Sequence, residues 1–177
     1  MKTPPDPAWP HWFVGFCDGE ASFTYKNTKS QSSPVRPVFK LTVQDDHTLI
    51  AEANEILFGG GYVSIDKSVG ALRDSGSIYS NRSELHIADK ARLQMLVDFF
   101  DTYPLRSHKR NDFRTWRELV GLYCRPKSDL RTNLMISLVE RLIQGRVSGM
   151  SQRGRERLEE TKKQNKSWVA TGDNVPS

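Results

Sequence analysis

Cysteine and histidine are scarce in this sequence, which has two cysteines and four histidines among its 177 residues. Cys17 and Cys124 stand far apart and form no CxxC spacing, so the sequence predicts neither a disulfide framework nor a zinc site. The simplest interpretation is a reducing compartment inside a cell. The histidines show no metal-ligand spacing, so a histidine-based metal centre is not expected.

Long apolar runs are also missing. The longest apolar cluster, Leu93 to Phe100, is broken by Asp98 and falls short of the roughly 18 apolar residues that a membrane span needs. Residues Met1 to Pro10 are rich in proline and show neither a secretory signal nor the Arg/Ser-rich character of a transit peptide. We therefore expect no membrane partner, and we expect such a protein, if it works in an organelle, to be made there.

Acidic residues are in the minority, since 21 Asp+Glu face 26 Lys+Arg, giving a formal net charge of +5 and a pI near 9.3. That balance favours a polyanionic partner, because cations placed along a nucleic-acid backbone release condensed counterions. Many basic proteins bind no nucleic acid, so charge alone leaves the partner open. The length and an apolar content of 37% suit one compact domain with a modest appendage.

A strongly apolar segment, His11 to Gly19, follows Pro10 near the start of the chain. Gly15 and Gly19 stand four residues apart on one face of the predicted helix, where they permit the close approach of another backbone. Apolar residues cover nearly every face of this helix and predict that it is buried on all sides; they are Trp12, Phe13, Val14, Phe16 and Cys17.

Two alternating segments come next and predict a hairpin whose polar face carries lysine and arginine. In the first segment the polar residues Ser22, Thr24 and Lys26 alternate with Phe23 and Tyr25. In the second segment one face holds Val35, Pro37, Phe39, Leu41 and Val43. The other face of that segment holds Arg36, Val38, Lys40, Thr42 and Gln44.

The later elements are predicted in the order helix, two strands and three helices. Thr48 is expected to cap the helix Leu49 to Phe58, which Gly59 to Gly61 end. Asp89 is expected to cap the next helix, which closes at Pro104 and has an apolar side made of Leu93, Leu96, Val97 and Phe100. The two strands are expected at Tyr62 to Ile65 and Ile78 to Ile87, and the last two helices at Asp112 to Tyr123 and Leu130 to Gln144.

This order predicts an α+β fold with an antiparallel sheet. We divide the chain into a proline-rich lead at residues 1–10, one domain at 11–145, and a basic tail at 146–177 that is partly disordered. Within the tail, Gln152 to Lys163 is compatible with a solvated helix. The cations of the tail form either a solvated face or a phosphate-binding arm; they are Arg146, Arg153, Arg155, Arg157, Lys162, Lys163 and Lys166.

The stretch Trp12 to Phe23, with the sequence WFVGFCDGEASF, resembles the signature helix of the LAGLIDADG endonucleases. The nine motif positions fall on Phe13 to Ala21, and Glu20 stands at the acidic, metal-binding position. Three segments that resemble later parts of the family follow in the same order: Phe39 to Gln44, Phe58 to Val63 and Phe99 to Lys109. The resemblance covers roughly residues 11–125, and the motif occurs once.

This resemblance implies the homing-endonuclease fold, a saddle-shaped antiparallel sheet backed by helices, and site-specific cleavage of double-stranded DNA. It also implies that Glu20 and Gly19 bind Mg²⁺ (or Mn²⁺), a cation that suits oxygen ligands. Gln44 is then expected to orient the attacking water, and Lys109 to offset negative charge in the transition state. His47 lies near Gln44 in the sequence and is a further candidate for the same pocket.

One motif supplies one catalytic acid per chain, and two are needed. The resemblance therefore implies a homodimer that recognises a near-palindromic site, with Gly15 and Gly19 at the dimer interface. The sheet is then expected to lie in the major groove, where the edges of the base pairs are distinguishable. The candidate DNA-binding residues are Ser22, Thr24, Lys26, Arg36, Lys40, Thr42, Lys67, Arg73, Asn81 and Arg82.

Two positions of the motif call for a different interpretation. Asp18 is expected to fix the helix end rather than bind metal, and Ala21 stands where the family usually has glycine, so its methyl group could shift the neighbouring carboxylate.

The alternative function is that of an RNA-binding maturase, or of an RNA-associated protein of the same fold without nuclease activity, with intron RNA as partner. By resemblance alone, we expect an intron-encoded protein of a mitochondrion or chloroplast.

Overall fold

The computed structural model describes residues 6–28, 35–44, 46–60, 64–66 and 82–145, together with 156, 159, 160, 162 and 163; for 64–66 and Arg82 it describes the backbone only. The predictions for Lys67, Arg73 and Asn81, and most of those for the lead and the tail, lie outside these residues. The chain forms two compact units. Unit 1 is Met1–Phe23 with Val38–Arg110, and unit 2 is Thr24–Pro37 with Asn111–Ser177.

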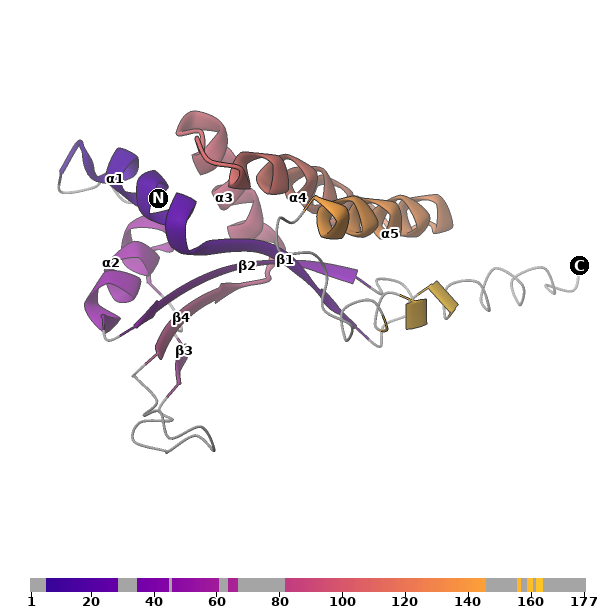
Figure 1. Cartoon of the computed structure of the whole chain (residues 1–177), viewed down its shortest axis with the longest axis horizontal. Helices are drawn as coiled ribbons and strands as arrows, with labels where there is room; N and C mark the ends of the chain where they lie inside the picture. The colour runs from indigo at the N-terminus through magenta and orange to yellow at the C-terminus, as the bar shows by residue number, and fades with distance from the viewer. Residues whose placement is uncertain are drawn as a thin grey trace, which may run out of the picture. The chain divides into compact units, whose positions relative to one another are not determined.

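The elements follow the predicted order, as Figure 1 shows, and the α+β prediction is confirmed. In chain order they are α1 Trp9–Glu20, β1 Ala21–Asn27, β2 Val35–Gln44, α2 His47–Phe58, β3 Ser64–Asp66, β4 Arg82–Ile87, α3 Lys90–Thr102, α4 Lys109–Cys124 and α5 Asp129–Gln144. The four strands form one sheet in the order β1-β2-β4-β3. Strand β4 runs antiparallel to both β2 and β3.

The helix ends follow local capping chemistry. The carboxylate of Asp46 accepts a hydrogen bond from the Leu49 N–H at 2.9 Å, so Asp46 caps α2 and the expectation for Thr48 was wrong. The reason is that a cap accepts from the N–H three residues onward, and the helix already begins at His47. Gly59 ends the same helix, as predicted, with a φ of 73° that favours glycine.

Helices α1 and α4 also begin earlier than the sequence predicted, by two and three residues. Helix α1 starts at Trp9, so Pro10 lies in its first turn, where a proline loses no helical hydrogen bond. Helix α4 starts at Lys109 rather than Asp112. Asp89 caps α3 as predicted, because its carboxylate accepts from the Arg92 N–H at 2.9 Å.

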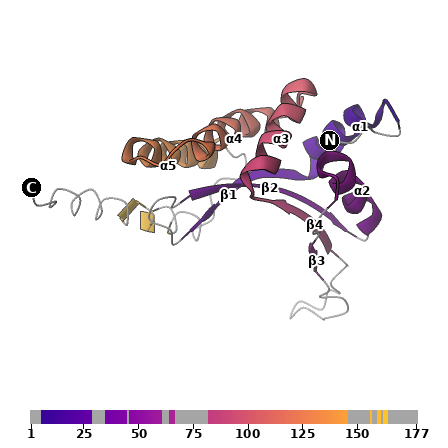
Figure 2. The same cartoon turned by 180° about the vertical axis from the view of Figure 1, so that it is seen from behind.

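Aromatic rings fill the core of unit 1. Phe100 of α3 meets the rings of Phe23 and Phe39 from the sheet, with centroids 5.4 and 6.1 Å away. Phe99 meets Phe13 of α1 edge to face, with centroids 5.7 Å apart. Figures 1 and 2 show α1, α2 and α3 on the same side of the strands of this unit. The apolar core therefore fixes the end of α1 against the start of the sheet.

Unit 2 has a core of its own between α4 and α5. Trp116 is fully buried, and its indole N–H donates to the backbone carbonyl of Thr24 at 3.1 Å. Arg131 is buried as well, and its guanidinium donates to the carbonyl of Arg125 at 3.0 Å. This bond gives a buried polar group a partner and closes the connection between the two helices.

Candidate active site

The end of α1 carries the acidic residue on which the predicted chemistry depends. Glu20 is the last residue of the helix, and its side chain is exposed. The last carbonyl oxygens of a helix have no partner inside it, and they favour a cation. The ammonium group of Lys109 donates to the carbonyl oxygen of Gly19 and, at 3.4 Å, to that of Cys17. The structure therefore brings Lys109 to the helix end that carries Gly19 and Glu20.

Asp18 ties a distant part of unit 1 to this helix end. One oxygen of its carboxylate accepts from the N–H of Arg106 at 2.9 Å. The other accepts from the N–H of Ser107 at 3.2 Å and from its hydroxyl at 2.7 Å. Asp18 thus acts within the chain, in line with the expectation that it has a structural role. No sequence signal pointed to Ser107 as its partner.

Ala21 occupies the position where the family usually has glycine. It has φ −76° and ψ 154°, an extended conformation that any L-residue adopts, and its methyl group is buried. Its N–H donates to the carbonyl oxygen of Cys17, which closes the helix. The backbone at this position therefore makes no demand for glycine.

Cys17 faces the core on the same stretch of helix. Burial raises the pKa of its thiol well above the ordinary value, and the nearby charge of Lys109 offsets only part of that rise. Cys17 is fully buried and its protonated thiol is a poor nucleophile, so no part of the site chemistry is assigned to it.

Gln44 and His47 lie at the other end of the hairpin's second strand. Gln44 is exposed and is the last residue of β2, and Figure 1 shows the end of β2 and the start of β1 at the same end of the sheet. Gln44 therefore shares the end of the sheet at which Glu20 leads into β1. The ring of His47 makes a close hydrogen bond through Nδ1 with the Ser83 hydroxyl of β4. His47 is thus bound to the sheet beside Gln44.

The register of β2 and β4 defines a polar strand face in unit 1. Lys40 pairs with His86, Thr42 with Glu84 and Gln44 with Arg82, so these positions share one face of the sheet. The ammonium of Lys40 bonds both carboxylate oxygens of Glu84, at 3.0 and 3.2 Å. Lys40, predicted to bind DNA, is therefore partly neutralised within the chain.

Glu84 and His86 were missed by the sequence reasoning. His86 is exposed and Glu84 is half-buried, whereas Leu85 and Ile87 between and beside them are in the core. The alternation of polar and apolar residues could have assigned both to the polar strand face. What the sequence lacked was the register that sets them opposite β2.

The other predicted DNA-binding residues fall in both units. In unit 1, Ser22 is exposed and Thr42 is half-buried. In unit 2, Lys26 and Arg36 are exposed, and Thr24 is half-buried. Their exposure is compatible with contacts to a ligand, and their roles remain predictions.

Val38 does not belong to the polar face to which alternation assigned it. Pro37, Val38 and Phe39 are all buried, so β2 is covered on both faces at this point. A strand covered on both faces has consecutive apolar residues, and alternation then misassigns one of them.

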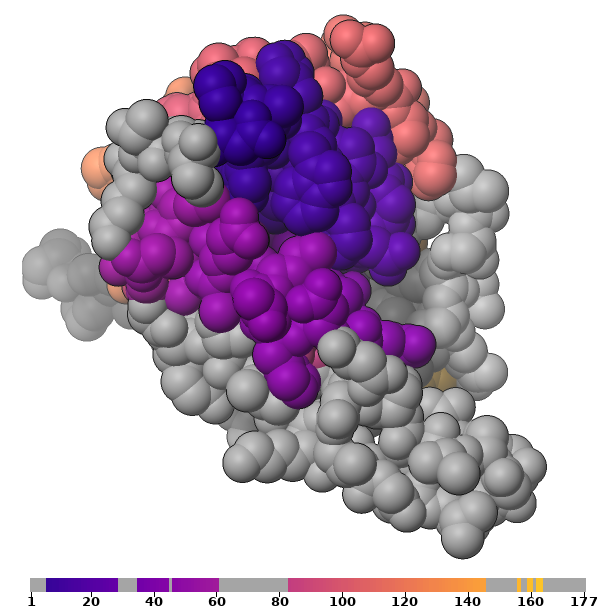
Figure 3. Space-filling model, turned by 90° about the vertical axis from the view of Figure 1, so that its left-hand side faces the viewer, coloured from indigo at the N-terminus to yellow at the C-terminus, as the bar shows by residue number. Residues whose placement is uncertain are grey.

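Helix α1 is not buried on all sides, contrary to the prediction. One face packs into unit 1 through Trp9, Phe13, Val14 and Cys17. The opposite face, here called the free face of α1, consists of Trp12, Gly15, Phe16 and Gly19; Trp12 is 48% exposed. Figure 3 shows the α1 segment, in indigo, at the surface. Among the residues that the structure describes, no element covers Trp12, and this is why the prediction failed.

The free face also has open space around its glycines. A Cβ added at Gly15 or Gly19 would meet nothing within 4 Å. The rings of Trp12 and Phe16 stack beside them, with centroids 5.6 Å apart. The face is therefore apolar, with Trp12, Gly15 and Gly19 exposed and Phe16 half-buried.

The family model of the LAGLIDADG endonucleases matches residues 13–120. This chain belongs to the LAGLIDADG endonuclease family. Members of this family hydrolyse phosphodiester bonds in DNA. The match includes Glu20, Gln44 and Lys109.

Solved structures show the same fold. The homing endonuclease I-TnaI is 22% identical, with a TM-score of 0.65 over 93% of this chain and 99% of its own. The archaeal intron-encoded homing endonuclease I-Vdi141I, complexed with DNA, is 17% identical, with a TM-score of 0.68 over 92% and 97%. The meganuclease I-SmaMI, bound to uncleavable DNA, is 23% identical, with a TM-score of 0.61 over 84% of this chain and 48% of its own. No curated protein matches the chain.

I-TnaI and I-Vdi141I match this LAGLIDADG chain along nearly their whole length, whereas the chain spans about half of I-SmaMI. I-SmaMI has also been solved on an uncleaved DNA target in the presence of calcium ions. This family member thus corresponds in length to the whole of I-TnaI and I-Vdi141I and to about half of I-SmaMI.

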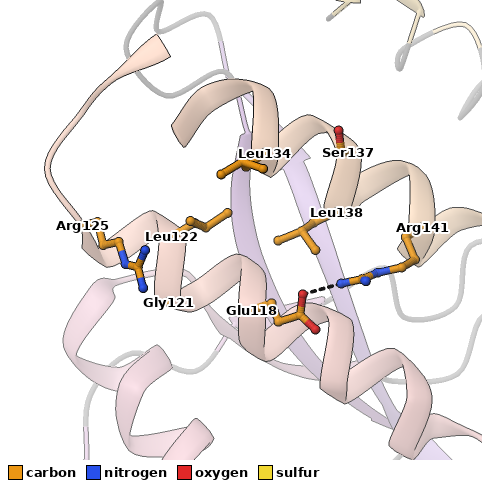
Figure 4. A pocket seen from close by; sticks show the side chains of 8 residues that line it. All are labelled: Glu118, Gly121, Leu122, Arg125, Leu134, Ser137, Leu138 and Arg141. Atoms are coloured by element: carbon orange, nitrogen blue, oxygen red, sulfur yellow. Dashed lines mark hydrogen bonds and ion pairs between the residues drawn. The ribbon is translucent and has the colours of Figure 1, made fainter. Parts of the chain in front are cut away.

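A groove on unit 2 of this family member contains none of the predicted site residues. Figure 4 shows it between α4 and α5, with a volume of about 630 Å³. Glu118 and Arg141 form an ion pair across it. Its floor and rim include Leu122, Leu134, Leu138 and Arg125.

The part of this LAGLIDADG chain that the structure describes contains no group of three His, Cys, Asp or Glu side chains that could hold a metal ion. The assignment of Glu20 and Gly19 as metal ligands stays a prediction. Among the same described residues, no helix has the length and apolar character to cross a membrane.

Proposed function

We propose that this protein is a site-specific endonuclease that cuts double-stranded DNA as a homodimer, using a divalent metal ion. The observation that carries the proposal is the end of α1, where exposed Glu20 follows Gly19, whose carbonyl binds the ammonium of Lys109. A carboxylate suits a hard cation, and an ammonium nearby suits a phosphate. One chain brings one such carboxylate, so the working unit has two chains.

The free face of α1 supports the homodimer. Gly15 and Gly19 each cost a helix about 1 kcal/mol relative to alanine. Close packing within the chain does not require glycine at either position, because an added Cβ would meet nothing within 4 Å. A second copy of α1 packed on the same face explains both glycines and covers Trp12 and Phe16. Such a two-fold axis gives a near-palindromic target.

The donors at the helix end fit Mg²⁺ or Mn²⁺. Glu20 supplies a carboxylate, and the carbonyl oxygen of Gly19 has a second lone pair beside the one that accepts from Lys109. Two Glu20 carboxylates brought close together, one from each chain, would repel each other, and bound cations would offset that repulsion. When bound, such metal ions activate water and stabilise the leaving oxygen.

The chain's own residues provide the rest of the chemistry. Lys109 is placed to offset the negative charge that develops on the phosphate, and an ammonium is most effective where it is already held. Gln44, exposed at the same end of the sheet as Glu20, has an amide that can both donate to and accept from a water molecule. It is assigned the orientation of the attacking water.

Recognition of DNA is assigned to the exposed and half-buried polar residues of the strands. The cationic residues Lys26, Arg36 and Lys40 are assigned to phosphates or base edges. Ser22, Thr24 and Thr42 are assigned to hydrogen bonds from their hydroxyl groups in the major groove. Both I-Vdi141I and I-SmaMI were solved with DNA, which supports duplex DNA as the ligand. An intron-encoded origin in a mitochondrion or chloroplast is a further expectation that rests on the family resemblance.

The test is cleavage of a randomised duplex library with Mg²⁺ and, separately, with Ca²⁺. We expect recovery of one near-palindromic site that is cut with Mg²⁺ and only bound with Ca²⁺. Glu20→Gln should abolish cutting and leave binding in Ca²⁺ largely intact. Glu52→Gln, at an exposed carboxylate of α2, is the matched control and should cut normally.

Two outcomes would overturn the proposal. Retained cutting by Glu20→Gln would remove the assigned site. Absence of cutting in either metal, with intron RNA bound in preference to duplex DNA, would favour the RNA-binding alternative.

A further inference from the structure

A lysine at a catalytic position is useful only if its ammonium group is held in place. Its side chain has four rotatable bonds and loses much rotamer freedom when it is fixed. Here the ammonium of Lys109 is held by the carbonyl oxygens of Cys17 and Gly19. The backbone of Lys109 comes from a different part of the chain, 90 residues away from Gly19. Something must therefore bring the start of α4 to the end of α1.

The hydrogen bonds of Ser107 provide that connection. Its hydroxyl donates to the carboxylate of Asp18 at 2.7 Å and accepts from the N–H of Lys109 at 3.1 Å. Its carbonyl oxygen accepts from the N–H of Arg110 at 3.1 Å, so Ser107 also closes the first turn of α4. A single hydroxyl thus connects a carboxylate of α1 to the backbone of Lys109.

Asp18 and Glu20 have different directions because of helix geometry. Residues two positions apart in sequence are separated by about 200° around a helix axis. The carboxylates of Asp18 and Glu20 therefore point to opposite sides of α1. Asp18 takes the side of Arg106 and Ser107, while Glu20 is exposed. Both belong to the same helix end. A backbone held by Asp18 is therefore held relative to Glu20.

We propose that Asp18 and Ser107 are positioning residues that set Lys109 beside Glu20 for phosphodiester cleavage. Neither residue touches the substrate, and both act through Lys109. The inference rests on the proposed function, because it concerns the use of Lys109 in cutting DNA. It assigns to the motif's first carboxylate a contribution to the rate of cleavage beyond the folding of the helix.

The experiment is a double-mutant cycle on the full chain with the recovered target, read as the single-turnover cleavage rate in Mg²⁺. Asp18→Asn replaces one accepting oxygen with a donor that opposes the N–H groups of Arg106 and Ser107. We expect it to slow cleavage by about 10- to 100-fold, the size of effect typical for a residue that orients another functional group. DNA affinity in Ca²⁺ should change by less than about threefold. In the Lys109→Met background, Asp18→Asn should have almost no further effect.

Ser107 gives a matched pair that avoids any charge change. Ser107→Ala removes the hydroxyl and should slow cleavage by roughly tenfold, whereas Ser107→Thr keeps it and should restore most of the rate. This pair keeps the inference testable if Asp18→Asn fails to fold, which circular dichroism would reveal.

The outcomes separate the inference from the proposed function. If Asp18→Asn slows cleavage by the same factor with and without Lys109, Asp18 acts independently and the inference is wrong. Unchanged cleavage by Ser107→Ala would overturn it as well. If Lys109→Met itself cuts normally, the assigned role of Lys109 fails first.

Discussion

The two faces of α1 have similar apolar character and opposite surroundings. On one face Trp9 stacks on Phe13, with ring centroids 4.8 Å apart, and both side chains are buried. On the free face Trp12 stacks on Phe16 in nearly the same way, yet Trp12 stays 48% exposed. The difference shows that a helix can be apolar on all sides without being buried on all sides within its own chain. In the proposed homodimer, a second copy of α1 would cover the apolar residues of the free face.

The polar strand face also contains neighbouring residues in different surroundings. Lys40 is committed within the chain to Glu84, whereas His86, opposite it in the register, is exposed. Net charge alone therefore overstates how much of this surface is available to a polyanion.

The largest expected effect comes from filling the free face. Gly15→Leu places a side chain in open space, so the single chain should fold, with a gain of about 0.5–1 kcal/mol in helix propensity. The same side chain blocks close packing of a second α1. We expect a monomer by sedimentation and a loss of cleavage of more than about 100-fold, because one chain supplies one Glu20.

The matched control is Gly121→Leu. Gly121 is an exposed glycine of α4, and an added Cβ there also meets nothing within 4 Å. It should leave the dimer and the cleavage rate unchanged. A dimer that persists in Gly15→Leu would contradict the assignment of the free face.

The next effect separates the two faces by stability. In the Gly15→Leu background, where no partner contributes, Phe13→Ala should lower the free energy of unfolding by about 3–5 kcal/mol, because it leaves a cavity in the core. Trp12→Ala should lower it by about 1 kcal/mol or less. Urea unfolding measures both values. Equal losses would mean that the free face is packed within the chain.

A smaller effect concerns the two thiols. Cys17 lies on the buried face, while Cys124 is exposed. We expect Cys124 to react readily with a thiol reagent and Cys17 to react roughly 100-fold more slowly, because its reaction needs local opening. Counting modified thiols against time checks this. Comparable rates would show that the buried face of α1 opens easily.

The pH dependence of stability follows from the same thiol. The pKa of Cys17 is raised in the folded state, mainly by burial, above its ordinary value of 9.0. Its contribution is therefore fully present below pH 9.0 and declines as the pH rises above that value. The difference in unfolding free energy between the natural chain and Cys17→Ala should shrink in this alkaline range. A constant difference would indicate that the folded-state pKa is not raised.

The smallest effect tests the polar strand face. Glu84→Gln removes the carboxylate that engages Lys40, so Lys40 should become available to a DNA phosphate. We expect a few-fold tighter binding and an increase of about 1 in the slope of log affinity against log salt. Lys40→Met in the same background should reverse the gain. An unchanged slope would mean that Lys40 faces no phosphate.

Local patterns were predictable because they depend on near neighbours in the chain. Gly59 and Asp89 were assigned correctly, since one requires a positive φ and the other offers a side-chain acceptor to a helix start. The same reasoning failed for α2, where two acceptors, Asp46 and Thr48, stand on either side of His47. A choice between close candidates depends on where the first helical turn forms.

Part of the candidate site could also be anticipated. The family resemblance singled out Glu20 and Gly19 in the motif and Lys109 in a later segment, and the structure brings them to one helix end. Ser107 gave no signal, because a serine before a helix is commonplace and its partner Asp18 is 89 residues away in sequence. Pairings over such a separation are set by the packing of the core.

The sequence by itself determined the order of the elements, the single acidic motif and the family, because these depend on periodicity and on residue type along the chain. Only the tertiary structure decided which face of α1 is free, that Glu84 engages Lys40, and that Asp18 reaches Lys109 through Ser107. The physical reason is that burial and hydrogen bonding depend on neighbours in space. Those neighbours are chosen by the shared core and the strand register.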